Sequence, residues 1–374
     1  MPRVSGRAGA WIAPSAFQGW VRQQTIGKEL ALPRTGSEVE IQGKRLKLSN
    51  LDKVLYPEAG FTKAQVIDYY VRIAPAMLRH LRGRPLTMKR YPEGVGGFFF
   101  YEKNCPTHRP DWVKTARIWS EGNQRWMQYC LVEDLPTLVW AANLADLELH
   151  TSLSLARNMG RPTVMVFDLD PGAPANILQC TRVSLWLRAI LDNFGLEAYP
   201  KTSGSKGLQL YVPLKSRVTY GETKPFAHEL AKLLEVQHPE LVVSDMKKSL
   251  RVGKVFVDWS QNDQHKTTIC VYSLRARERP TVSTPVTWEE VERAHREQDP
   301  GLLVFEPAQV IERYQRMGDL FGPVLTTKQR LPPVDTIRAL REETEGTVGT
   351  PGRRGPLAAR SAAPARTRKR KVAK

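Results

Sequence analysis

The chain has 374 residues, which is enough for one large domain or two lobes around a full hydrophobic core. Its 41% hydrophobic and 25% charged residues are ordinary for a soluble globular protein, and no apolar stretch approaches the length of a membrane span. The formal net charge of +18 favours a polyanionic partner, with nucleic acid ahead of a membrane surface.

The N-terminal half contains several recognisable elements. Residues 1–40 have no sustained periodicity and are expected to form a flexible extension. Alternating residues around Gln42-Gly43 predict a hairpin over 38–50, and helical spacing after Thr62 predicts a helix over 62–81. "RPLTMKRYP" is typical of a strand, "GGFFFYEKN" of an exposed loop or edge, and 137–153 is interpreted as a second helix.

The C-terminal half alternates between strand and helix patterns. This alternation predicts an α/β (α+β) fold, with helices packed against central sheets. After about residue 340 the Gly, Pro, Ala and Arg content predicts a largely disordered tail, where residues 345–374 hold nine Lys or Arg and one acid. The expected strands are 164–169, 208–213, 254–258 and "TTICVYSLRAR", and the expected helices are 175–194, 223–235, 287–295 and 307–319.

The cysteines carry less information. Cys105, Cys130, Cys180 and Cys270 are far apart and form no C-x-x-C pair. We therefore expect reduced thiols of a cytoplasmic protein rather than zinc ligands or disulfides.

Two aspartates stand at the end of the buried run "VMVFDLDPG" (164–172). Side chains at i and i+2 of a strand share a face, so Asp168 and Asp170 project together while Leu169 points into the core. Such like charges are costly unless something positive lies between them. The pair is explained either by a solvated strand end or turn, or by a divalent-metal site of oxygen ligands.

Two further stretches favour the metal site. Within "KTSGSKGL" (201–208), residues 202–207 are interpreted as a small flexible loop with hydroxyls, backbone amides and Lys206. Such a loop suits a triphosphate, although it lacks P-loop spacing and a Ser/Gly-rich turn alone is also typical of a plain connection. "KVFVDWSQN" (254–262) delivers Asp258 at the end of another strand, among lysines and arginines. Three strand-end carboxylates on a basic chain suit two divalent ions and a nucleotide.

These motifs, in this order, resemble the polymerase domain of bacterial ligase D proteins. That family belongs to the archaeo-eukaryotic primase superfamily and serves non-homologous end joining. "LSNLDKVLYPEAGFTK" (48–63), "LRGRPLTMKRYPEGV" (81–95) and "FFYEKNCPTHRPDW" (99–112) match as well. The resemblance covers roughly residues 41–325, so we expect an extension over 1–40, a primase-polymerase catalytic domain with the primase-like core over 41–325, and a basic tail over 326–374.

The resemblance also implies roles for individual residues. Asp168, Asp170 and Asp258 would be catalytic and would hold two Mn²⁺ or Mg²⁺ ions. Lys53 and Lys63 would bind the 5′-phosphate at a gap or break, and Phe100 and Tyr101 would stack on the template, with Tyr101 replacing a more usual Phe. The residues implied in nucleotide binding are His150, Ser203, Lys206, Gln261, Arg275 and Arg251, the last being a loop arginine near the templating strand.

The function implied is a template-directed nucleotidyltransferase that prefers ribonucleotides and fills gaps or extends ends during DNA break or excision repair. No K-x-D-G adenylation motif occurs, which predicts a stand-alone polymerase of the mycobacterial type. Its expected partners are nucleoside triphosphates, gapped or broken DNA, an ATP-dependent DNA ligase and Ku, in a bacterial, nucleoid-associated, cytoplasmic setting without a membrane. The alternatives are a primase that starts chains de novo, a two-metal phosphodiesterase and a non-catalytic DNA-end binding module.

Overall fold

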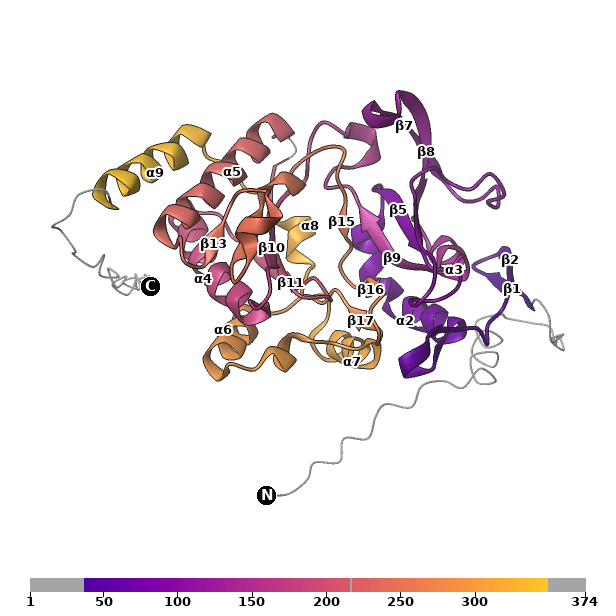
Figure 1. Cartoon of the computed structure of the whole chain (residues 1–374). Helices are drawn as coiled ribbons and strands as arrows, with labels where there is room; N and C mark the ends of the chain where they lie inside the picture. The colour runs from indigo at the N-terminus through magenta and orange to yellow at the C-terminus, as the bar shows by residue number, and fades with distance from the viewer. Residues whose placement is uncertain (1–36, 216, 349–374) are drawn as a thin grey trace, which may run out of the picture.

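The computed structural model describes residues 37–215 and 217–348, and two β-sheets form the centre of this part of the chain (Figure 1). The first sheet has the order β15 (Thr268–Ile269), β9 (Asp146–Thr151), β5 (Pro85–Arg90), β8 (Arg125–Leu131) and β7 (Thr115–Ser120), with β6 (Phe100–Glu102) also paired to β5. The second has the order β11 (Tyr199–Thr202), β12 (Leu208–Pro213), β10 (Val164–Pro171), β14 (Val255–Asp258) and β13 (Val242–Val243). This mixture of sheets and helices confirms the predicted fold class.

Helices and short hairpins cover these sheets. The helices are α2 (Lys63–Leu81), α3 (Leu135–Asn143), α4 (Ile177–Asn193), α5 (Tyr220–Gln237), α6 (Trp288–Glu297), α7 (Pro307–Met317), α8 (Pro323–Thr326) and α9 (Val334–Val348). The hairpins are β1 (Ser37–Ile41) with β2 (Lys44–Leu48), β3 (Val54–Tyr56) with β4 (Phe61–Thr62), and β16 (Leu274–Arg275) with β17 (Thr281–Val282). Helix α2 begins where predicted because Thr62 and Gln65 cap each other's backbone N–H groups.

Strand β10 is shared by two hydrophobic cores. Val164 and Val166 belong to the core that includes α2 and α3, whereas Met165, Phe167 and Leu169 belong to the core beneath α4 and α5. Successive side chains of a strand point to opposite faces, so one eight-residue strand contributes to both cores. The even-numbered face of β10 is therefore directed toward the first sheet.

The expected helix over 137–153 is wrong in its second half. Helix α3 ends at Asn143, Ala145 adopts a left-handed φ of 57°, and residues 146–151 form β9. In β9, Leu147 and Leu149 are buried in the first core, while Glu148 and His150 lie on the other face. Residues 146–151 therefore have the alternating pattern of a strand, but the helical spacing of the residues before them suggested that the helix continues.

Two other expectations differ from the structure. Cys105 and Cys130 form a disulfide, because the segment after β6 runs beside β8 and brings their Cα atoms to 5.1 Å. Cys180 and Cys270 are free, as expected, and both are buried.

Within the segment predicted to be a disordered tail, residues 334–348 form α9. Ile337 is fully buried in the second core and Arg341 pairs with Glu229 of α5 at 2.8 Å. The rest of that predicted tail, from residue 349, and most of the predicted extension lie outside the described residues.

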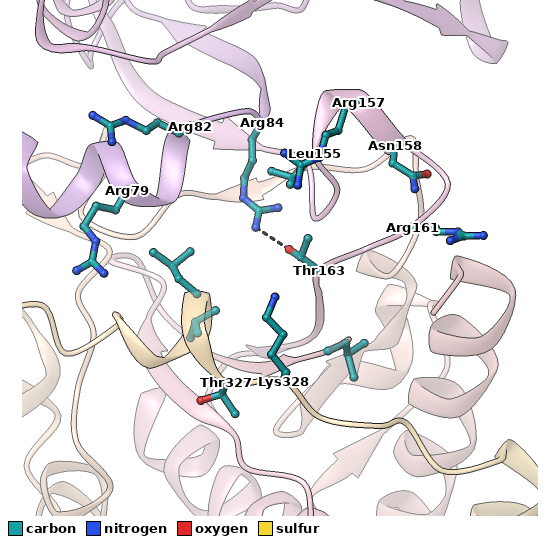
Figure 2. A pocket seen from close by; sticks show the side chains of 13 residues that line it. Arg79, Arg82, Arg84, Leu155, Arg157, Asn158, Arg161, Thr163, Thr327 and Lys328 are labelled. Carbon is teal, nitrogen blue, oxygen red and sulfur yellow. Dashed lines mark hydrogen bonds between the residues drawn. The ribbon is translucent and has the colours of Figure 1, made fainter. Parts of the chain in front are cut away.

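Among the helices of the described part, none is long and apolar enough to cross a membrane. Two hollows on the surface of this part are relevant to function. One lies beside β6, and the other, lined by arginine side chains, lies where β10 begins (Figure 2).

Candidate active site

Asp168, Asp170 and Asp258 lie on the same face of the second sheet. On β10, Asp168 and Asp170 continue the even-numbered face of Val164 and Val166. On β14, Val255 and Val257 are buried in the second core, so Asp258 occupies the opposite face. The register pairs Asp168 directly with Asp258 across the two strands. Sheet geometry alone therefore brings the three predicted carboxylates together.

Among these three aspartates, Asp168 has a raised pKa because its charged form is destabilised. Desolvation, followed by repulsion from Asp258, raises its pKa to about 6, against a lowering contribution from a hydrogen bond with Gln209. The Oε1 atom of Gln209 is buried without a hydrogen-bond partner. Lys201, which faces Gln209 in the register with β12, is fully buried and donates to Ser283 Oγ at 2.6 Å. A carboxylate destabilised by its neighbours and an unused amide oxygen beside it suit a bound cation.

Asp170 and Asp258 are held by different groups. Asp170 lies 3.1 Å from Lys206 Nζ and 3.6 Å from Arg251 Nη1. Asp258 accepts hydrogen bonds from the backbone N–H of Ser260 at 2.9 Å and from Gln261 Nε2 at 3.1 Å. In the part of the chain that the structure describes, no group of three or more His, Cys, Asp or Glu is close enough to hold one metal ion. The three aspartates share a face without forming a closed ligand cluster.

The Ser-Gly-Ser-Lys loop is fixed against the end of β10. Ser203 Oγ accepts hydrogen bonds from the N–H groups of Ser205 at 3.2 Å and Gly207 at 3.1 Å. A Cβ atom on Gly207 would lie 2.1 Å from the carbonyl oxygen of Leu169, so only glycine allows the loop to approach the strand this closely. Because the loop lies this close to β10, Lys206 lies beside Asp170, with 3.1 Å between its Nζ atom and the carboxylate.

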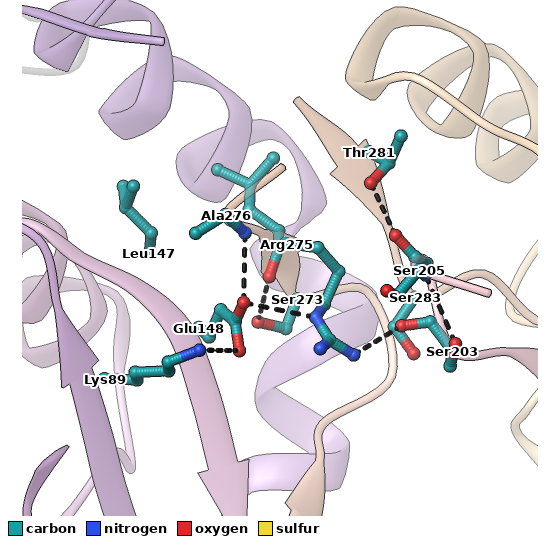
Figure 3. A network of polar contacts seen from close by, with 12 residues as sticks. Lys89, Leu147, Glu148, Ser203, Ser205, Ser273, Arg275, Ala276, Thr281 and Ser283 are labelled. Atoms are coloured by element: carbon teal, nitrogen blue, oxygen red, sulfur yellow. Dashed lines mark hydrogen bonds and ion pairs between the residues drawn. The ribbon is translucent and has the colours of Figure 1, made fainter. Parts of the chain in front are cut away.

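Arg275 connects this loop with the first sheet (Figure 3). Its Nη1 donates to the carbonyl oxygen of Ser203 at 2.8 Å, and its Nε lies 3.3 Å from Glu148 Oε1. Glu148 is 2% exposed and also receives the backbone N–H of Ala276 at 3.0 Å. A single arginine thus joins the two sheets through one carboxylate and one carbonyl.

Glu148 is the centre of a cationic cluster. His150 Nε2 lies 3.0 Å and Lys89 Nζ 3.4 Å from Glu148 Oε2. Burial alone would raise the pKa of Glu148, but the hydrogen bond from His150 and the charge of Arg275 hold it well below its usual range. Burial lowers the pKa of His150, and Glu148 opposes that shift. The carboxylate therefore stays ionised and positions two of the predicted nucleotide-binding side chains.

The two predicted end-binding lysines lie close together. The backbone N–H of Lys63 donates to the carbonyl oxygen of Lys53 at 2.8 Å. Lys63 is buried, and its Nζ donates to the carbonyl oxygen of Ser49 at 2.7 Å. Desolvation and the charge of Lys53 lower the pKa of Lys63 to about 8. Lys53 in turn pairs with the exposed Glu93 at 2.8 Å.

The predicted aromatic pair lies on the edge strand β6. Tyr101 is 55% exposed, and its ring meets that of His150 edge to face at 5.9 Å. The guanidinium of Arg90 lies 5.1 Å above the ring of Phe100. Both residues line the hollow beside β6, a depression of about 620 Å³ that also includes Lys103, His108 and Arg125. Tyr101 is thus exposed and Phe100 partly buried. Aromatic rings among cations are typical of a single-stranded nucleic-acid surface.

Two residues of the site were missed by sequence reasoning. Glu148 lay in the segment interpreted as a helix, where its alternation with Leu147 and Leu149 could have identified it. Lys201 directly precedes the predicted loop, but an isolated lysine within a short strand gives no sign that it will be buried near Asp168. His150 and Arg275 contact Glu148, and Arg275 also contacts Ser203 of the loop. Lys206 and Arg251 contact Asp170, and Gln261 contacts Asp258.

Three strand-end acids, a hydroxyl-rich loop and clustered cations define a nucleotidyltransferase of the polymerase class. A family model described as the primase-polymerase domain of LigD matches residues 62–321, and the chain belongs to that family. It is 40% identical over 304 residues to a multifunctional non-homologous end joining protein LigD of Mycolicibacterium smegmatis, covering 81% of this chain and 39% of that protein. It is 32% identical over 301 residues to a bifunctional non-homologous end joining protein LigD of Bacillus subtilis, covering 80% and 47%.

A solved structure supports the same placement. The polymerase domain from Mycobacterium tuberculosis ligase D, in complex with DNA, matches with a TM-score of 0.70 and 40% identity, covering 76% of this chain and 99% of that one. The chain spans less than half the length of the curated relatives described above.

Proposed function

We propose that the chain is a template-directed, metal-dependent nucleotidyltransferase that prefers ribonucleotides and fills gaps or extends ends during DNA break repair. The observation that carries the proposal is the single sheet face on which Asp168, Asp170 and Asp258 stand beside the Ser203–Gly207 loop. Acidic side chains would be needed for metal-assisted phosphoryl transfer, and the loop and its cations would be needed for a triphosphate. A module that only holds DNA ends would need neither.

Mn²⁺ or Mg²⁺, as two ions, would be held by Asp168, Asp170 and Asp258. The raised pKa of Asp168 and the unpaired Gln209 Oε1 support a cation at this point, since both would gain from a positive charge. When bound, such ions activate the attacking oxygen and stabilise the leaving group.

The chain's own cations would orient the nucleotide. Lys206 and Arg251 neutralise Asp170 in the structure, and both become available for phosphate oxygens once Asp170 ligates a cation. Arg275 and His150 are held in place by Glu148, so their donors are already ordered before the nucleotide arrives. Ser203 would present its hydroxyl from the loop, and Gln261, fixed by Asp258, would lie near the sugar.

DNA would lie along the first sheet. Phe100 and Tyr101 would stack on template bases over the hollow beside β6, and Lys53 with Lys63 would bind the 5′-phosphate of the downstream strand. A DNA substrate places the protein at the nucleoid in the bacterial cytoplasm, and repair of a break requires a ligase to seal it. The names of the relatives support a role in end joining, where an ATP-dependent ligase and Ku are the expected partners.

Primer extension tests this function directly. Wild type is given ribonucleotides or deoxyribonucleotides on gapped and blunt-ended DNA with Mg²⁺ or Mn²⁺, beside a reaction without primer. Asp168→Asn should lower nucleotide addition by about 100-fold or more while DNA binding is retained, because the charge lost stabilises the transition state. Asp192→Asn, an exposed aspartate of α4, is the control and should behave as wild type.

The same assay separates the alternatives. Addition of nucleotides without primer would identify a primase, and equal or better use of deoxyribonucleotides would contradict the ribonucleotide preference. Activity in Asp168→Asn close to that of wild type would remove the basis for the catalytic assignment.

A further inference from the structure

A hollow of about 310 Å³ lies at the opposite end of β10 from the aspartates (Figure 2). Thr163, which precedes β10, and Leu214, which follows β12, both line it. Asp168 is five residues further along an extended strand, roughly 17 Å away, so the hollow is separate from the candidate active site. Its cationic lining consists of Arg79, Arg82, Arg84, Arg157, Arg161 and Lys328.

Arg84 forms the inner wall and has unused donor capacity. Its Nη1 donates to the carbonyl oxygens of Ser152 and Leu153, and its Nη2 donates to Thr163 Oγ1 at 2.7 Å. A guanidinium carries five N–H donors, so the Nε–H and one Nη2–H have no partner in the described residues. All three acceptors are neutral, and desolvation lowers the pKa of this arginine. Within residues 37–215 and 217–348, therefore, no carboxylate pairs with the charge of Arg84.

Among the described residues, the other cations have few acidic partners, although the charge of Arg161 contributes to lowering the pKa of the exposed Glu222. Of the six, Arg79 alone has an ion pair within the described residues, at 3.4 Å from Asp319, and Asp319 is shared with His80. In the described part of the chain, the side chain of Arg82 donates to the backbone carbonyl of Glu133. None of the described residues that line the hollow is acidic. In Figure 2, Arg84 and Lys328 extend toward each other from opposite walls, which concentrates positive charge at the centre.

The lining indicates the class of ligand. Arginine forks bind phosphate in a bidentate manner, and clustered uncompensated cations favour a multiply charged anion. Leu155, Leu214 and Val324 provide an apolar wall against which a base or sugar can pack. The volume is at the lower end of the range for small-ligand pockets, which accommodates about one nucleotide unit and excludes a duplex.

We propose that this hollow binds the phosphates of a single-stranded nucleic-acid segment, at a site independent of the polymerase centre. The proposal rests on the basic lining and not on the proposed catalytic function. A free polyphosphate offers the same chemistry without bases or sugars, so the test compares the two sources.

The test reverses charges at the exposed rim of the hollow, where a substitution does not disturb the packing of the core. Arg157→Glu/Lys328→Glu is compared with Arg293→Glu/Arg316→Glu, which changes the net charge equally on exposed positions of α6 and α7. Each full-length protein is titrated against a fluorescent single-stranded oligonucleotide of about 12 nucleotides at one stated salt concentration and then across a salt series. Inorganic tripolyphosphate is the competitor.

The hollow variant should bind the oligonucleotide about tenfold or more weakly than the control variant, because charged contacts to phosphate are lost. Its plot of log affinity against log salt should be shallower by roughly 1.4, the amount expected for two fewer phosphate contacts on a single strand. Tripolyphosphate should compete only at far higher concentration than an unlabelled oligonucleotide.

An equal loss of oligonucleotide affinity in the two double variants would overturn the proposal, because the change in net charge alone would then explain the loss. Tripolyphosphate competing as well as the oligonucleotide would also overturn it, in favour of a free polyphosphate ligand. Nucleotide addition to a short gapped duplex is measured in parallel and should be unchanged in the hollow variant. An inactive wild type in that assay would contradict the polymerase function alone, leaving the binding comparison intact.

Discussion

Replacing Glu148 by Gln removes one negative charge from the centre of the cationic cluster while preserving the size of the side chain. Lys89, His150 and Arg275 would then face one another without a counter-ion in a place where Glu148 itself is 2% exposed. Removing one member of a buried ion pair costs about 3–5 kcal/mol, because the remaining charge is desolvated and unpaired. The new amide can still accept the N–H of Ala276, so we expect a loss of about 3 kcal/mol in the free energy of unfolding.

Urea unfolding followed by tryptophan fluorescence measures this loss, with Glu292→Gln as the control. Glu292 pairs with Arg188 at 3.0 Å on the surface, with exposed fractions of 48% and 35%, and its removal should cost less than about 1 kcal/mol. Steady-state kinetics add a second readout, since misplaced Arg275 and His150 should raise KM for the nucleotide. If Glu148→Gln unfolds within about 1 kcal/mol of wild type and keeps its KM, the carboxylate is neither a stabilising centre nor a positioning residue.

The remaining predictions concern the DNA end, the loop and the tail. The proposed binding of phosphate by Lys63 requires its protonated form, so the preference for 5′-phosphorylated over unphosphorylated gaps should decline as pH rises through about 8. Lys53→Ala/Lys63→Ala should lose that preference at every pH, and an equal loss of affinity on both substrates would show general phosphate contacts instead. Gly207→Ala should lower the free energy of unfolding by about 1–3 kcal/mol, measured by thermal unfolding, and should reduce nucleotide addition in primer extension. Gly160→Ala is the control and should change neither quantity, because its Cβ atom would meet nothing within 4 Å. Deleting residues 349–374, which carry nine Lys or Arg, should weaken binding to all DNA alike and flatten its salt dependence; a loss confined to one DNA structure would refute this.

The positions of the aspartates were predictable because they depend on the period of a strand. Once Val164–Phe167 is recognised as buried, the parity of side chains places Asp168 and Asp170 on one face, and the structure agrees. The direct pairing of Asp168 with Asp258 was not predictable in this way, because it depends on β10 pairing with β14. The two residues are 90 positions apart, and no local pattern indicates that their strands pair.

What the sequence could not predict depends on contacts between distant segments. The Cys105–Cys130 bond requires β8 to lie beside the segment after β6, and spacing along the chain gives no sign of this. Helix α9 has a polar composition that is typical of a tail, but Ile337 and the Arg341–Glu229 pair anchor it to the second core. In both cases a tertiary contact overrides what spacing or composition along the chain indicates.

The path of the chain through the two sheets has a consequence for synthesis on the ribosome. The first sheet is completed by β15 at residues 268–269, and its core also contains Tyr272, Leu274, Val310 and Phe321. Residues 37–151 therefore leave the ribosome long before the segments that cover their apolar surface, although domains commonly fold as units from the N-terminus during translation. Nascent chains arrested before about residue 320 should thus expose an unfinished first core that binds chaperones, and the two sheets should acquire protease resistance together rather than in turn.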